Sequence, residues 1–173
     1  MGEIKLSNKL FWDAEECNDI VKKIITGEEH PEHKHLIFCN FKCKFKDTLT
    51  GQNWDKLGKI NRINDLMWCE CNLDFILVIN HSIWINLTDD QKETTLLHFL
   101  SKIKVYIKYK DRKKKSLKSP EDGDSFDYAV TPSGRIDYTI VPPDIEEYES
   151  VGKDKKEIYS EIKKIIKSKQ NED

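Results

Sequence analysis

The chain has 173 residues, which is enough for one domain with a sizeable core and too few to expect two. Charged residues make up 35% and aromatic residues 10% of the chain, a balance typical of a heavily solvated globular protein rather than of a disordered one. The formal net charge is -2, so no global electric field would attract nucleic acid or imitate its charge.

The beginning of the chain has no apolar stretch of the kind found in a secretory signal, and no apolar run approaches the length that spans a membrane. The chain has five cysteines, and an odd number without an export signal favours reduced thiols over a disulfide framework. We therefore expect a soluble protein of the cytoplasm that makes no membrane contact.

The first predicted helix begins at Asp13, a residue type that caps helices, and Glu16 fits the reciprocal position of a capping box. Gly27 supplies a stop signal. Between them, apolar residues recur at helical spacing: Cys17, Ile20, Val21, Ile24 and Ile25. The pattern predicts a helix that packs one face against a core.

Three further segments precede the second long helix. From Leu36 to Phe45 apolar and basic residues alternate, which predicts a strand with one solvated face. Residues 59–64 read as a short strand, whereas residues 66–73 fit either a loop or a strand edge. The continuous apolar run from Asp74 to Asn80 predicts a central strand that is buried on both faces.

Thr88 begins the second long helix, with Gln91 in the capping-box position. Its predicted buried stripe consists of Leu96, Leu97, Leu100, Ile103 and Ile107, which would carry the helix to about Lys110. The residues that follow are mostly basic, and like charges repel, so a mobile loop is predicted near residues 108–125.

The last third of the chain predicts a hairpin whose turn is formed by residues 131–134. A short helix capped by Asp144 and a final amphipathic helix over residues 154–169 follow, and the tail 168–173 is expected to fray. This order of elements predicts a single α+β domain over residues 1–173, with a small, mostly antiparallel sheet packed against helices.

Several segments occur in an order that resembles the putative phage metallopeptidase family, zincin-like proteins of bacteriophages and related mobile elements. The matching segments are the apolar strand at 74–80, Trp84, LTDDQK at 87–92, LLHFL at 96–100 and PPDIEEY at 142–148. In the family the helix continues as H-E-L-x-H. The resemblance runs from Leu36 to about Lys164, and it implies a zincin-like fold and a phage setting.

The resemblance also implies a zinc site, and this chain departs from it at three of four positions. Zinc would need two histidines one helical turn apart, a third ligand and a glutamate base. His98 matches the first histidine, but Phe99 replaces the base and Lys102 the second histidine. Pro143, or its neighbour Pro142, stands where the third histidine would be. We therefore predict a pseudoenzyme with no catalytic residue, no metal at this position and no cofactor.

Two other readings concern the histidines. Without the resemblance, His98 reads as a half-buried histidine on the apolar face of an amphipathic helix. A structural metal is also conceivable, because imidazole and thiolate are the ligands that zinc prefers; its candidate ligands are His30, His33, His35, Cys39 and Cys43. Against this site, the two thiols share a strand face and fit a core, and their spacing is a poor match to zinc ribbons.

Three functions follow from these patterns. The first is a protein that binds a host or phage partner, such as a nucleoprotein defence complex, as an inhibitor of the anti-CRISPR or anti-restriction type. The second is a zinc-dependent peptidase or metal-binding protein with a rearranged site. The third is a nucleic-acid-binding protein that uses the basic segment. The candidate partner-binding residues are Lys108, Lys110, Arg112, Lys113, Lys114, Lys115, Lys118, Asp144, Glu146 and Glu147.

Overall fold

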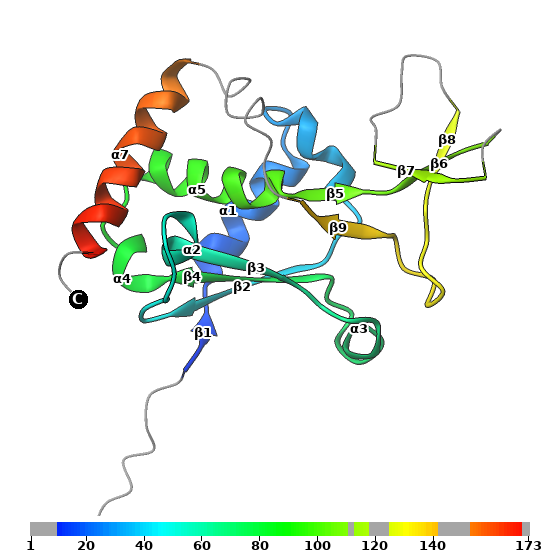
Figure 1. The fold of residues 1–173 in the computed structure, drawn as a ribbon, viewed down its shortest axis with the longest axis horizontal. Helices are drawn as coiled ribbons and strands as arrows, with labels where there is room; N and C mark the ends of the chain where they lie inside the picture. The colour runs from blue at the N-terminus through cyan, green and yellow to red at the C-terminus, as the bar shows by residue number, and fades with distance from the viewer. Residues whose placement is uncertain (1–9, 111–112, 118–124, 142–152, 171–173) are drawn as a thin grey trace, which may run out of the picture.

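The computed structural model describes residues 10–110, 113–117, 125–141 and 153–170. Helices and small sheets are combined in one core, which confirms the α+β class (Figure 1). Every strand pair but one is antiparallel, as predicted. Within the described part of the chain, no helix is long and apolar enough to cross a membrane.

The main sheet has four strands in the order β1–β2–β4–β3. These strands are β1 (Trp12–Asp13), β2 (Phe41–Lys46), β3 (Gly58–Arg62) and β4 (Phe75–Asn80). The β2–β4 pair is the parallel one. β4 lies between two neighbours, and its residues are buried apart from Ile76. The apolar run at 74–80 is therefore a central strand, as its sequence predicts.

Three long helices cover this sheet and pack against one another (Figure 1). They are α1 (Glu15–Thr26), α5 (Asp89–Ser101) and α7 (Lys153–Gln170). The capping box at the start of α5 is confirmed, because Thr88 Oγ1 accepts from Gln91 N–H while Gln91 Oε1 accepts from Thr88 N–H. Shorter helices fill the connections: η1 (Pro31–Leu36), α2 (Trp54–Leu57), α3 (Asp65–Cys71) and α4 (His81–Trp84).

Two smaller sheets extend away from the main one (Figure 1). In the first, β5 (Ile103–Val105) pairs with β9 (Tyr138–Ile140). In the second, β6 is flanked by two strands; its members are β6 (Ile107–Tyr109), β7 (Lys115–Ser116) and β8 (Phe126–Tyr128). We call this second sheet, together with the described residues that join its strands, the β-arm. None of its residues belongs to the main apolar core, so it is a separate projection of the molecule.

The start of α1 differs from the prediction. Asp13 does not cap the helix, because it lies in β1 and its carboxylate is 2.7 Å from Lys44 Nζ and 3.3 Å from Lys42 Nζ. Ala14 is the N-cap and makes no side-chain capping bond. Glu16 instead accepts hydrogen bonds from residues of α4 and α5, described below. Pairing with β2 holds Asp13 in an extended conformation that a local capping pattern does not reveal.

The second long helix is shorter than predicted. It ends at Ser101, and residues up to Lys110 form β5, β6 and a turn. Ile103 and Ile107 are buried as expected, but on strands. The residues after Ser101 also alternate with period two and are rich in Ile and Val, so they suit a strand as well as a helix. Pairing of Ile103 with Ile140 on β9 decides between the two.

Two predictions in the first half of the chain were wrong in part. The strand predicted from Leu36 begins at Phe41, because residues 31–36 form the 3-10 helix η1. The segment at 66–73 is largely the helix α3 rather than a loop or strand edge. Asn64 caps α3 by accepting from Met67 N–H at 2.9 Å, a local signal that sequence reasoning missed.

The C-terminal third was partly predicted. The turn at 131–134 forms, with Thr131 N–H donating to Arg135 O, but the strands beyond it separate and pair with β6 and β5. The predicted mobile basic loop contains β7. The final amphipathic helix is confirmed and continues to Gln170, past the predicted point of fraying. The short helix after Asp144 falls outside the described residues.

Candidate functional site

His98 lies in an aromatic cage formed by α2, α5 and α7. Its ring is stacked on Trp54 with centroids 4.0 Å apart, and Phe99 and Tyr159 present ring edges at 5.3 Å and 6.1 Å. Only 2% of His98 is exposed, so it is more deeply buried than the sequence suggested. Burial, helped by the charges of Lys102 and Lys163, lowers the pKa of His98 to about 3. The imidazole is therefore neutral at physiological pH.

Phe99 occupies the centre of the core rather than a cleft. It is fully buried, and a Cβ added at Gly58 would lie 2.8 Å from two of its ring carbons. The ring thus packs directly on the backbone of β3, in space that only a glycine leaves open. This position, where the resemblance places the general base, is an apolar contact between α5 and the main sheet.

Lys102 follows the last residue of α5 and is the C-cap of that helix. Its Nζ is 5.0 Å from the centroid of the Phe99 ring, within cation–π range. Burial lowers the pKa of Lys102, and the nearby charge of Asp55 opposes that shift. Lys102 therefore lies against the wall of the cage. Pro143, Asp144, Glu146 and Glu147 lie outside the described residues.

Comparison with known protein families assigns the chain to one of them. The model of the putative phage metallopeptidase family matches residues 9–170, nearly the whole chain. The chain belongs to this family. No curated protein and no solved structure matches it. In this phage metallopeptidase homologue, His98, which the resemblance pairs with the first motif histidine, is enclosed by aromatic rings. The zincin-like fold stays an expectation from the resemblance.

A second histidine of the phage metallopeptidase homologue has a contrasting environment. His30, which is 9% exposed, follows α1, and its Nε2 is 3.1 Å from Glu93 Oε1 on α5. With Glu29 they form a group whose candidate ligand atoms all lie within 4.8 Å of one another. We call these three residues the His30 cluster. It is the one such group found among the described residues.

The other residues of the predicted histidine–cysteine metal set do not join this cluster. Both ring nitrogens of His35 face backbone carbonyl oxygens, of Glu32 at 2.9 Å and of Ile103 at 3.0 Å, so neither nitrogen is directed at a metal. His33 is buried, which lowers its pKa to about 4, and its ring is 6.3 Å from that of His30. It does not belong to the group whose candidate ligand atoms lie within 4.8 Å of one another.

The thiols are core residues, as their strand pattern suggested. Cys39 and Cys43 are buried, and burial raises the pKa of both, that of Cys43 to about 12. A thiol with a raised pKa is a weak metal ligand and a weak nucleophile near neutral pH. The Cys43 backbone N–H donates to Asn18 Oδ1 on α1, which fixes this part of β2 against the helix. The structure therefore does not bring these thiols and the histidines together in one group of candidate ligands.

The basic segment is divided between exposed and paired lysines. Lys108, Lys110, Lys113 and Lys114 are exposed on the β-arm and form no ion pair with another described residue. Lys115 is different, because its Nζ is 2.6 Å from Oδ2 of the buried Asp137. Its role is therefore to hold β7 against the body of the molecule. Arg112 and Lys118 fall in parts of the chain that the structure does not describe.

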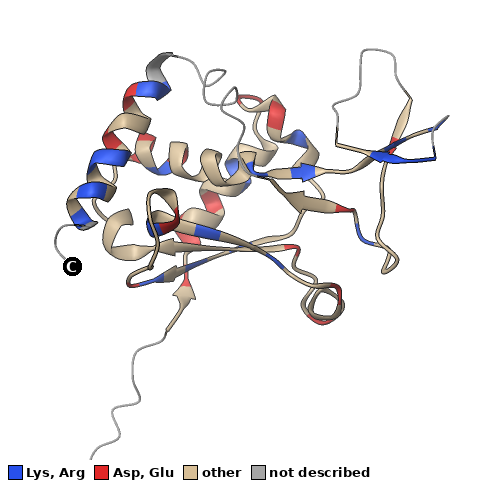
Figure 2. Ribbon diagram, viewed as in Figure 1, with Lys and Arg blue, Asp and Glu red and all other residues tan. Residues whose placement is uncertain are grey.

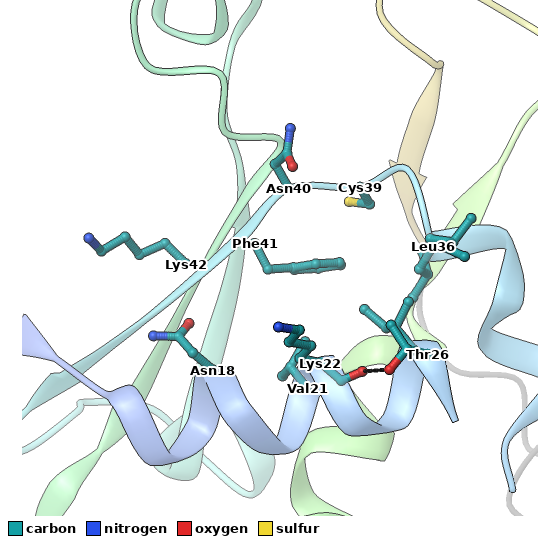
Figure 3. Close-up of a pocket in the computed structure, with 11 residues that line it drawn as sticks. Asn18, Val21, Lys22, Thr26, Leu36, Cys39, Asn40, Phe41 and Lys42 are labelled. Atoms are coloured by element: carbon teal, nitrogen blue, oxygen red, sulfur yellow. Dashed lines mark hydrogen bonds between the residues drawn. The ribbon is translucent and has the colours of Figure 1, made fainter. Parts of the chain in front are cut away.

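A groove of about 440 Å³ lies between α1 and the start of β2 (Figure 3). Phe41 lies across it, and Lys22 and Lys42 are at its margin (Figure 3). Its lining consists of Asn18, Val21, Lys22, Ile25, Thr26, Leu36, Ile37, Cys39, Asn40, Phe41 and Lys42. Neither the His98 cage nor the His30 cluster contributes to it. The groove is therefore separate from both histidine sites.

Glu29 and Glu93 are the site residues that sequence reasoning missed. Glu93 belongs to α5 and lies 63 residues from His30 in sequence, so only the packing of α1 on α5 brings the two together. Glu29 is adjacent to His30 in the sequence, but adjacency alone does not indicate a metal site. No spacing rule connects that pair to a glutamate on another helix.

Proposed function

We propose that this member of the phage metallopeptidase family is a pseudoenzyme that acts by binding a protein partner. In a phage or mobile-element setting, the role we assign is inhibition of a host defence system of the anti-CRISPR or anti-restriction type. The observation that carries the proposal is the aromatic cage of His98. A family position that should hold a metal and its water is instead part of a packed core.

Metal-dependent hydrolysis needs an open coordination position and a base that accepts a proton from the bound water. The described family positions supply one buried imidazole, one buried phenyl ring and one lysine amine. The phenyl ring cannot accept a proton. The Nε2 atom of the imidazole is buried, so a metal could reach it only by displacing packed side chains. This environment supports a structural role for His98.

The fold retains a surface suited to recognition, the β-arm. Its four exposed lysines gather positive charge on a projection from the core, in a chain whose overall charge is slightly negative (Figure 2). Exposed apolar side chains accompany them: Leu117 is 41% exposed and Val130, beside β8, is 58% exposed. Basic and apolar groups together suit an acidic protein surface, including the acidic face of a nucleoprotein complex.

The catalytic half of the proposal is tested by peptidase assays on the purified full chain. An unstructured protein such as casein is incubated with the chain and zinc, with and without a chelator, and cleavage is followed by electrophoresis. We expect no chelator-sensitive cleavage. Cleavage that the chelator removes, and that His98→Gln abolishes in a variant shown to be folded by circular dichroism, would contradict the pseudoenzyme assignment.

The binding half is tested by capture from a lysate of the host, comparing two variants with equal change in charge. One carries Lys108→Glu, Lys113→Glu and Lys114→Glu on the β-arm. The control carries Lys156→Glu, Lys164→Glu and Lys167→Glu on the exposed side of α7. We expect a stoichiometric protein partner to be retained by the wild type and the α7 variant and lost by the arm variant.

The same capture experiment distinguishes binding to a protein partner from the alternative of binding to nucleic acid. A partner that is nuclease-sensitive, and whose retention falls steeply as salt rises, would point to nucleic acid rather than protein. Retention of one protein by all three forms of the chain would place the interface away from the β-arm. Each result contradicts a specific part of the proposal.

A further inference from the structure

We propose that Glu29, His30 and Glu93 form a binding site for a divalent transition-metal ion of the zinc type. Their candidate ligand atoms lie within 4.8 Å of one another, which is the separation expected for groups that converge on one ion. An imidazole with two carboxylates is a donor set that zinc and neighbouring metals accept. This inference is independent of the function proposed above.

The orientation of His30 matches that of a metal-binding histidine. Its Nε2 faces Glu93 Oε1 at 3.1 Å, while its Nδ1 lies 3.4 Å from Glu32 Oε1. A ligating histidine usually donates its second ring N–H to a carboxylate, which fixes the tautomer and the plane of the ring. Glu32, whose carboxylate is within ion-pair distance of Nδ1, is the residue that we assign to that role. Only 9% of His30 is exposed, so its ring has little freedom to rotate away from the carboxylates.

The three ligands belong to segments that the fold already fixes. α1 ends at Thr26 with Gly27 as its C-cap, Glu29 and His30 follow, and His30 is the N-cap of η1. Glu93 lies in the first half of α5, downstream of its capping box. Because α1 packs on α5, these segments meet without any large rearrangement. An ion here would link the loop after α1 to α5.

The local charge favours a cation. Three carboxylates surround His30, and one amine, Lys23 Nζ, lies 3.9 Å from Glu93 Oε2. The Lys23 side chain is 67% exposed, so this ion pair is weak and easily exchanged. Three protein ligands leave room for solvent on an ion that takes at least four. The partly exposed Glu29 and Glu93 make the site reachable from solution.

Zinc titration of the chelator-stripped full chain, followed by calorimetry, tests the site. Cys69 and Cys71 are exposed on α3 and could bind zinc themselves, so both are first changed to serine. In this background we expect one ion per chain. Glu93→Gln should weaken the affinity at least tenfold, and Glu32→Gln should weaken it by about tenfold to a hundredfold. Glu70→Gln, an exposed change on α3, serves as the matched control and should leave the affinity unchanged.

Two results would overturn the inference: no binding at millimolar zinc, or the same affinity in Glu93→Gln as in the background. Thermal unfolding keeps the result interpretable if a variant is poorly folded. Zinc should raise the Tm of the background and of Glu70→Gln, but not that of a Glu93→Gln variant that unfolds cooperatively without zinc. Peptidase and capture assays do not enter this test, so its failure leaves the proposed function standing.

Discussion

His98 and His30 are both buried and both lie at α5: His98 belongs to this helix, and His30 contacts it through Glu93. Their surroundings differ. Aromatic rings surround His98, whereas carboxylates surround His30. The family motif directs attention to the first, and the chemistry of the contacts directs it to the second. A histidine's place in a motif therefore says less about metal binding than the donor atoms around it.

The largest effect that would test this contrast is expected at Phe99. Phe99→Ala removes a fully buried ring that packs on Gly58, and it should lower the free energy of unfolding by about 3–5 kcal/mol. Denaturant titration measures the change. Phe38→Ala is the matched control, because Phe38 is 64% exposed and should change stability by less than about 1 kcal/mol. A loss below about 1 kcal/mol in Phe99→Ala would show that the cage is not tightly packed.

The pH dependence of stability should reveal His98 next. Its pKa is about 3 in the folded protein and 6.5 for an unperturbed histidine, so the unfolded chain takes up the proton first as pH falls. This proton linkage has no effect above pH 6.5 and destabilises the fold progressively between 6.5 and about 3. Relative to His98→Leu, the wild type should lose about 2 kcal/mol between about pH 7 and pH 5.

Denaturant titrations at the two pH values measure this difference. The wild type and His98→Leu need not have equal stability at pH 7, because only the change with pH is compared. An equal loss in both proteins would mean that His98 is accessible to protons in the folded state. It would also remove the distinction between the cage and a solvated site.

A smaller effect is expected where α1 and α5 are joined by charge. Glu16 accepts from Trp84 Nε1 at 2.9 Å and from Lys92 Nζ at 2.6 Å, and these bonds, that of Lys92 first, lower its pKa. Glu16→Gln keeps the shape but weakens both bonds, with an expected loss of about 1 kcal/mol at neutral pH. The loss should shrink as acid protonates the wild-type carboxylate. An acid-independent difference between the two proteins would argue against the ionic contribution.

The smallest effect is expected on the β-arm. Lys113→Glu with Lys114→Glu should change the free energy of unfolding by less than about 0.5 kcal/mol, because both side chains are exposed and unpaired among described residues. Lys115→Glu should cost more, since it reverses the charge beside the buried Asp137. Thermal unfolding ranks the two changes. An order opposite to this one would mean that the arm depends on Lys113 and Lys114 for its own folding.

The sequence predicted elements whose signals are local. The apolar run at 74–80, the capping box of Thr88 and Gln91, and the final amphipathic helix are all found. Predictions failed where partners distant in sequence decide the structure. Asp13 pairs with β2, and the residues after Ser101 pair with β9, so neither outcome follows from local propensity. The missed cap at Asn64 is the exception, because that signal was local.

The candidate site residues also divide into those that local sequence indicates and those that only the packing of distant segments brings together. The resemblance places Phe99 where the family has a glutamate, which remains a prediction, and the structure shows that a phenyl ring fits there against Gly58. The His30 cluster was not visible, because Glu93 is distant in sequence and its helix was read for its apolar stripe. Lys115 was grouped with its basic neighbours, since the buried Asp137 that binds it lies beyond a turn.

The contact between Phe99 and Gly58 also bears on how such a protein could change over time. A carboxylate introduced at position 99 would meet the bare backbone of β3 and leave the space of the phenyl ring unfilled. A glutamate at position 99 would therefore need compensating replacements around it rather than one codon change. The glycine and the ring are matched to each other, so a change at either position alone should lower the stability of the fold.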